Sequence, residues 1–133
     1  MRSKKLLPLF IFVLINILNI NHSYSIEPDV FVQSTVNRAS EVLSSKLSKK
    51  EKIDKLKEIA SETVDIRGIG FYTLSTYRKS ISDDQIKQYE ILFKQYFLKS
   101  FASRLAEYSN PEIEVISKKK LNKNYTMVSS ILI

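Results

Sequence analysis

The chain contains no cysteine, and its 133 residues include a single histidine, His22. Without thiols it has no disulfide, no cysteine nucleophile, no thiolate metal site and no cysteine for a lipid anchor. His22 lies in the segment that we interpret below as a leader, so the exported part lacks imidazole, the commonest general base and metal ligand. We therefore expect no enzyme, no metal and no cofactor, although a hydrolase built on paired carboxylates stays open.

Glycine and proline are also scarce, with 2 and 3 residues, whereas 26% charged and 44% apolar residues are ordinary for a folded protein. The Gly68-Ile69-Gly70 segment lacks the third glycine and the preceding strand of a dinucleotide site. The formal charge of +7 falls to +4 when the leader's Arg2, Lys4 and Lys5 are set aside. This modest excess fits anionic membrane surfaces or acidic proteins, and export argues against nucleic acid.

The N-terminus has the three parts of a secretory signal peptide. Basic residues come first, and an apolar stretch of about 15 residues, Leu6–Ile20, follows, which is short of the roughly 20 that span a bilayer. Ser23 and Ser25 provide small residues at the −3 and −1 positions. We predict a signal peptide over 1–25, cleaved after Ser25, and one periplasmic domain over 26–133. The alternative is an uncleaved anchor, which exports the same domain.

Three helical segments are predicted in the first half of the domain. Apolar residues at steps of three and four indicate a helix over Asp29–Leu47. Ser48 followed by Glu51 forms a capping-box pattern that opens the next helix. From Thr63 towards Ser80 we expect a short helix or two, bent around the two glycines, because glycine weakens a helix.

A long helix follows. Ser82 and Gln85 form its capping box, and the helix is predicted to run to about Tyr108, before an Asn-Pro pair. Its apolar stripe is widened by Leu92 and Tyr96. The stripe itself consists of Ile86, Tyr89, Phe93, Phe97, Phe101, Leu105 and Tyr108.

After this helix the period changes to two. Alternation over Glu112–Val115 predicts a strand, Lys118–Asn124 a polar turn, and Tyr125–Ile133 a second strand with apolar residues, hence burial, on both faces. The fold class is α+β, with N-terminal helices packed on an antiparallel sheet. Since two strands alone are marginally stable, the sheet is expected to be incomplete at its C-terminal end.

The order of these features resembles the MlaC family, also called toluene-tolerance or ABC-transporter auxiliary proteins. The matching segments are Pro28–Val32, Val64–Ile66 with Ile69, Tyr72–Arg78, Tyr89, Phe93, Tyr96–Phe97, Arg104–Ser109, Val115 and Val128–Ile131. Ser75 and Tyr77 stand where the family has Gly and Trp. Family members continue through further strands, so the resemblance implies an N-terminal part of such a protein from a truncated or split gene.

The resemblance implies a periplasmic phospholipid carrier between an outer-membrane lipoprotein complex and an inner-membrane ABC transporter, with transient membrane contact, that maintains outer-membrane lipid asymmetry. Such a carrier must shield the lipid tails, since each exposed methylene costs about 0.8 kcal/mol. Arg78 is the headgroup candidate, with a surface ion pair as its alternative. The apolar cleft candidates are Leu74, Tyr77, Phe93, Phe97, Phe101, Val115 and Val128. Each of these has ordinary core packing as its alternative. Two alternative functions stay open for the chain: it is a periplasmic adaptor that binds a protein without lipid, or it is an inactive fragment.

Overall fold

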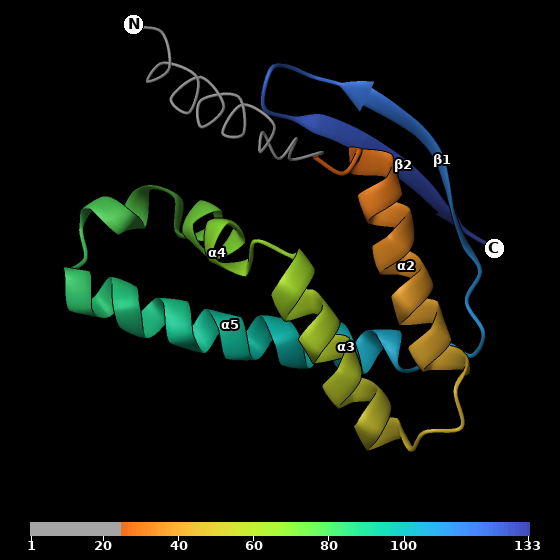
Figure 1. Cartoon of the computed structure of the whole chain (residues 1–133). Coiled ribbons are helices and arrows are strands. Elements are labelled where there is room, and N and C mark those ends of the chain that lie inside the picture. The colour runs from red at the N-terminus through yellow and green to blue at the C-terminus, as the bar shows by residue number, and fades with distance from the viewer. Residues whose placement is uncertain (1–24) are drawn as a thin grey trace, which may run out of the picture.

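The computed structural model describes residues 25–133, so the predicted leader lies outside the described residues apart from Ser25. Helices come first and a strand pair follows (Figure 1). The elements are α2 (Pro28–Ser44), α3 (Lys49–Thr63), α4 (Ile66–Leu74), the 3-10 helix η1 (Ser75–Lys79), α5 (Asp83–Leu105), β1 (Ile113–Lys120) and β2 (Thr126–Leu132). The two strands form an antiparallel sheet, which confirms the α+β class and the open sheet.

Two predicted helix starts are confirmed by their capping boxes. Ser48 N–H donates to Glu51 Oε2 at 2.9 Å, and Glu51 N–H donates to Ser48 Oγ at 3.3 Å. Ser82 and Gln85 make the same reciprocal pair at the start of α5. Each box satisfies two of the N–H groups that a helix start leaves without partners.

The predicted helix ends were too late at two places. α2 stops at Ser44, because Ser45 takes an extended conformation and its hydroxyl donates to Val42 O at 2.6 Å. α5 stops at Leu105, and the chain then turns through Asn110, whose φ is +53°. Apolar residues beyond these points kept the helical spacing without extending the helix.

The glycines do not bend α4, contrary to prediction. Asp65 caps the helix by accepting from Gly68 N–H at 2.9 Å, and both glycines lie inside the continuous helix. The break comes at Ser75, with φ of +49°. Gly70 is needed for packing instead, since a Cβ there would lie 2.9 Å from Phe93 Cδ1 on α5.

The strand β1 runs through three lysines that were predicted to form a turn. Its register pairs Lys120 with Thr126, so the turn is confined to residues 121–125. The Lys118 ammonium donates to Glu27 and Asp29, each at 2.8 Å, which fastens this part of the strand to the start of α2. Lys118 therefore lies in this edge strand with its ammonium group paired to two carboxylates.

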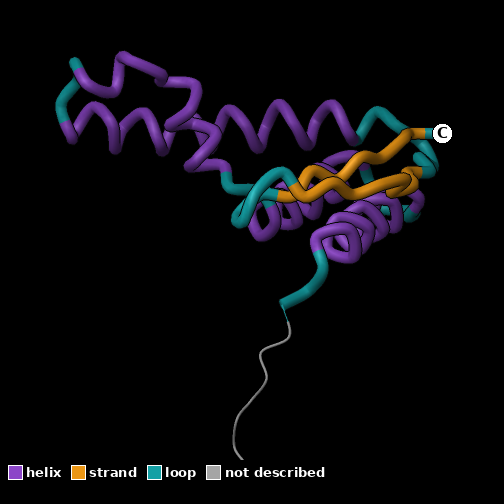
Figure 2. Tube along the Cα trace, turned by 90° about the horizontal axis from the view of Figure 1, so that it is seen from above, coloured by secondary structure: helices purple, strands orange, loops and turns teal. Residues whose placement is uncertain are grey.

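One face of the sheet packs on α2, and the strands lie side by side over the helices in Figure 2. The Gln33 amide of α2 accepts from Val115 N–H at 3.0 Å and donates to Ile113 O at 3.3 Å. The other face leaves Met127 and Ile131 exposed. The prediction that the second strand is buried on both faces is therefore wrong, because the described residues include no element that covers this side.

The core lies where α2, α3 and the end of α5 meet, at Leu43, Leu56 and Ala102. We call residues 28–64 and 98–132 the bundle region. Residues 66–97, which comprise α4, η1 and most of α5, extend to one side in Figures 1 and 2, and we call them the arm. Leu92 and Tyr96 do not widen the buried stripe as predicted, since they are 57% and 70% exposed.

Candidate apolar ligand cleft

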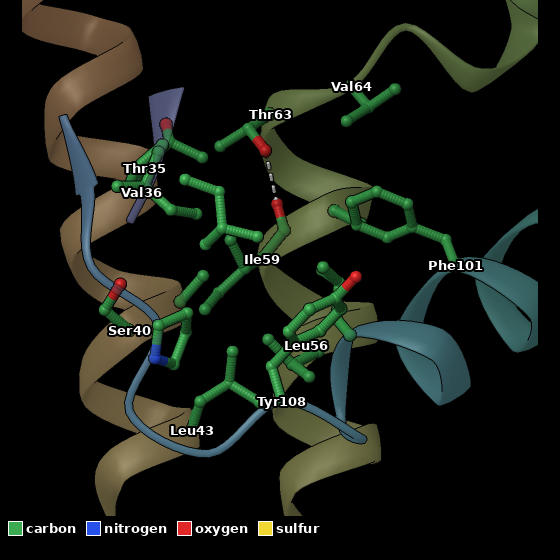
Figure 3. A pocket seen from close by; sticks show the side chains of 16 residues that line it. Thr35, Val36, Ser40, Leu43, Leu56, Ile59, Thr63, Val64, Phe101 and Tyr108 are labelled. Atoms are coloured by element: carbon green, nitrogen blue, oxygen red, sulfur yellow. Dashed lines mark hydrogen bonds between the residues drawn. The ribbon is translucent and has the colours of Figure 1, made fainter. Parts of the chain in front are cut away.

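An apolar cleft of about 270 Å³ opens in the bundle region (Figure 3). Its walls come from α2, α3, the end of α5 and the near end of the hairpin. The lining residues are Thr35, Val36, Ala39, Ser40, Leu43, Leu56, Ile59, Ala60, Thr63, Val64, Phe101, Leu105, Tyr108, Pro111, Ile113 and Leu132. The amphipathic faces of α2 and α3 thus form a cleft as well as a core.

None of the lining side chains is charged. Two of the lining hydroxyls are engaged by their own helices, because Thr63 donates to Ile59 O at 2.7 Å and Thr35 donates to Phe31 O at 2.9 Å. The surface offered to a ligand is therefore mostly hydrocarbon. Such a surface favours apolar ligands through the hydrophobic effect and offers no group for acid-base chemistry.

The volume of the cleft bounds the ligand. A cavity of about 150 Å³ with similar lining holds benzene, and pockets for small molecules run from about 300 to 1,000 Å³. At about 270 Å³, the cleft has room for part of one acyl chain but not for two complete chains.

Of the seven cleft residues predicted from the sequence, Phe101 is the one that lines this cleft. It projects from α5 towards α3 in Figure 3, and 39% of it is exposed. Its ring stacks on Phe97 with centroids 5.6 Å apart, and Phe97 lies 6.2 Å from Phe93. Four rings of the predicted stripe, from Tyr89 to Phe101, therefore form a continuous row, and Phe101 is the ring of this row that borders the cleft.

The other aromatic candidates lie in the arm. Phe93 packs against Gly70 and borders a shallower hollow of about 300 Å³ between α4 and α5. The Arg67–Glu90 ion pair, at 2.9 Å, lies in the same hollow. Leu74 is half-buried at the end of α4, and Tyr77 is 72% exposed on η1. The structure does not bring these side chains to the cleft.

The remaining candidates are also outside the cleft. Val115 and Val128 are half-buried in the hairpin. Arg78 is exposed on η1, before α5 begins, whereas Phe101 lies eighteen residues after the first residue of α5. At 1.5 Å per residue this is about 27 Å of helix. A contact between Arg78 and a headgroup stays a prediction that the cleft itself does not require.

Sequence reasoning missed the helical walls of the cleft. Leu43, Leu56 and Ile59 lie on the apolar faces of the two predicted helices, but none of them was a cleft candidate. Periodicity identifies a face that is turned inward, but it does not distinguish filled space from a hollow. Pro111 is buried and lines the cleft, but it lies outside the segments with apolar periodicity, so no sequence pattern identified it.

Two features of other protein classes are absent from residues 25–133. No helix there is long and apolar enough to cross a membrane. No cluster of three or more His, Cys, Asp or Glu side chains in that range has the geometry to hold a metal ion.

The fold and the site define a small α+β domain with an uncharged, apolar cleft between its helices and hairpin. The MlaC protein family matches residues 33–133, and the chain belongs to that family. Proteins of this family are periplasmic and bind phospholipids in lipid trafficking, as carriers rather than enzymes. No curated protein and no solved structure matches the chain.

Proposed function

We propose that the chain is a periplasmic carrier that binds a phospholipid by inserting acyl-chain carbon atoms into the cleft between α2, α3 and α5. The observation that carries the proposal is the uncharged, hydrocarbon lining of this cleft in a member of the MlaC family. A lipid crossing water exposes its tails at about 0.8 kcal/mol per methylene, and partial burial reduces that cost.

The proposed route runs between an outer-membrane lipoprotein complex and an inner-membrane ABC transporter, and its outcome is the maintenance of outer-membrane lipid asymmetry. The predicted leader over residues 1–25 supports export to the compartment where such a route operates. The small cleft volume supports a carrier that releases its ligand easily, because affinity grows with the apolar area buried.

The test is lipid analysis of protein purified from the periplasm after export of the full chain. Ser40 lines the cleft from α2 and is half-buried, so Ser40→Phe fills the space that a chain would occupy. We expect wild-type protein to carry phospholipid, detected by extraction and mass spectrometry. Ser40→Phe should lower the yield about tenfold, which corresponds to about 1.4 kcal/mol of lost binding.

The matched control is Ser44→Phe, on the same helix at an exposed position outside the lining. It adds the same ring and should leave the lipid yield unchanged. Circular dichroism would establish that both variants keep their helices. Well-folded wild-type protein that carries no phospholipid would count against the carrier.

A second candidate function is a periplasmic adaptor that binds another protein and no lipid. The observation that favours it is the exposed aromatic surface of the arm, where Tyr72, Tyr77 and Tyr96 are 85%, 72% and 70% exposed. Tyrosine is enriched at protein interfaces. Under this function the wild-type protein should carry no lipid, and replacing these three side chains by serine should weaken the binding of the partner protein.

A further inference from the structure

The backbone groups of β1 that point away from β2 are bound by a side chain of α2. Ile133 N–H donates to Glu112 O across the ladder at 2.8 Å. Because bonded and non-bonded pairs alternate along an antiparallel ladder, the backbone groups of Ile113 and Val115 point away from β2. Gln33 donates to Ile113 O at 3.3 Å and accepts from Val115 N–H at 3.0 Å. Its amide therefore takes the place that a peptide group of a neighbouring strand would take.

The orientation of the Gln33 amide is fixed by its partners. Its Oε1 has to face Val115 N–H, because a flipped amide would place two donors against each other. The second hydrogen of Nε2 is donated to Asn37 Oδ1, one turn further along α2, at 2.9 Å. The oxygen and both hydrogens of the amide are thus engaged, and a flexible, half-buried side chain is held in one rotamer.

This contact lies at the wall of the apolar cleft. Ile113 lines the cleft from β1, and Val36 lines it from the same helix as Gln33. We propose that Gln33 is a positioning residue of the cleft, whose amide holds Ile113 against α2 and so keeps the hairpin wall closed on an apolar ligand. Gln33 is not itself a lining residue, so it acts through Ile113. The inference rests on the lipid-binding function proposed above.

The size of the effect follows from the population of the closed wall. Two part-buried hydrogen bonds join Gln33 to β1, and their loss should make the open wall much more populated. The apparent affinity for a ligand falls in proportion to the population of the binding-competent state. Loss of the Gln33 amide should therefore lower lipid retention about tenfold, although every residue that lines the cleft is unchanged.

The hairpin has a second attachment to α2, which provides the matched control. Lys118 donates to Glu27 and Asp29, and it lies five residues after Ile113, about 17 Å along the strand. Lys118 does not line the cleft. Lys118→Gln loosens the hairpin at this distant point and should leave lipid retention unchanged. An equal loss in Lys118→Gln and in a Gln33 variant would overturn the positioning role, since any loosening of the hairpin would then suffice.

The test compares Gln33→Met and Gln33→Glu with wild type, each exported as the full chain. Lipid retention is the phospholipid left on the protein after dialysis, measured by mass spectrometry relative to wild type at the same pH. Gln33→Met keeps the length of the side chain without its hydrogen bonds and should retain about tenfold less lipid at neutral and at acid pH. Gln33→Glu should match it at neutral pH, because a carboxylate cannot donate to Ile113 O.

Acid should rescue Gln33→Glu but not Gln33→Met. A protonated carboxyl group has one donor and one acceptor, so it can replace the amide towards both Ile113 O and Val115 N–H. A variant that had merely unfolded would not regain lipid in acid.

Other carboxylates and one ammonium group flank this contact. They are Asp29 on α2 and Glu112, Glu114 and Lys118 on β1, of which Asp29 and Lys118 form an ion pair. Every Gln33 variant keeps all four groups, so their titration affects Gln33→Met and Gln33→Glu alike and cannot imitate the rescue.

Amide hydrogen exchange separates this inference from the carrier function. Val115 N–H should exchange faster in Gln33→Met than in wild type, whether or not lipid is bound. Unchanged exchange, equal lipid retention by Gln33→Met and wild type, or a lack of acid rescue would each overturn the positioning role and leave the carrier in place. Well-folded wild-type protein without phospholipid would overturn the carrier, and the role of Gln33 in lipid retention with it.

Discussion

The bundle region buries most of the apolar core, whereas the arm contains one of the six buried apolar residues of the described chain, Ile66. In the bundle region Leu43, Leu56 and Ala102 are 3%, 1% and 0% exposed and form the core. In the arm Tyr72 and Leu92 are 85% and 57% exposed. The arm is held mainly by the packing of α4 on the first part of α5, and the bundle region by three helices and a hairpin.

The core and the proposed binding cleft therefore lie in the same region. The cleft is lined by Leu43 and Leu56, which also belong to the core, so ligand entry and core packing are linked. Segments with few buried apolar contacts open at low free energy. We therefore expect the arm to exchange its amide hydrogens earlier than α3.

The largest expected effect tests the bundle region directly. Leu56→Ala removes the largest fully buried side chain, and it should lower the free energy of unfolding by about 2–5 kcal/mol. Denaturant unfolding of the exported protein measures this change. The matched control in the arm is Leu92→Ala, which should cost no more than about 0.5 kcal/mol. Similar losses in the two variants would remove the contrast between the regions.

The helices of both regions were predictable from local chemistry. Ser48 and Ser82 fix helix starts through contacts within four residues, so sequence alone identified them. Helix ends and the hairpin depend on distant partners. The extension of β1 through Lys118 depends on Glu27 and Asp29, about ninety positions earlier, and no local pattern reveals that contact.

The candidate site was only partly predictable for a related reason. The resemblance directed attention to aromatic residues of the long helix, and Phe101 does reach the cleft. The other walls come from α2 and α3, whose apolar periodicity is the same whether they bury a core or line a hollow. Phe93 and Phe101 lie on the same stripe of α5, and only Phe101 lines the cleft. Which of them does so depends on where α3 packs against α5.

A smaller effect tests how the arm is held together. Gly70→Ala places a methyl group within 2.9 Å of Phe93 Cδ1, and overpacking of this kind costs about 1–3 kcal/mol. Alanine also favours the helix by about 1 kcal/mol, so we expect a net loss of about 1 kcal/mol, measured by denaturant unfolding. In a Phe93→Ala background the clash is absent, and Gly70→Ala should become stabilising. The same loss in both backgrounds would show that the Gly70–Phe93 contact does not hold the arm.

The smallest expected effect concerns the exposed ion pairs that join the hairpin to α2. The hydrogen bond from Lys118 lowers the pKa of Asp29, and the bonds to Asp29 and Glu27 raise the pKa of Lys118. A lowered carboxyl pKa adds stability above the unfolded value, about 3.9 for aspartate, and that stability is lost as the pH falls through the folded pKa. The raised lysine pKa adds stability below the unfolded value of about 10.4, which is lost as the pH rises through the folded pKa.

These signs define the experiment on the hairpin attachment. Wild-type protein should unfold at a slightly higher denaturant concentration than Lys118→Gln between those two limits, and the difference should vanish in acid and shrink in salt. Lys119→Gln removes the same charge from the neighbouring residue, which makes none of these contacts, and should show no such pH dependence. An equal pH dependence in both variants would assign the effect to net charge, and the attachment of the hairpin to α2 would then rest on Gln33 and apolar packing.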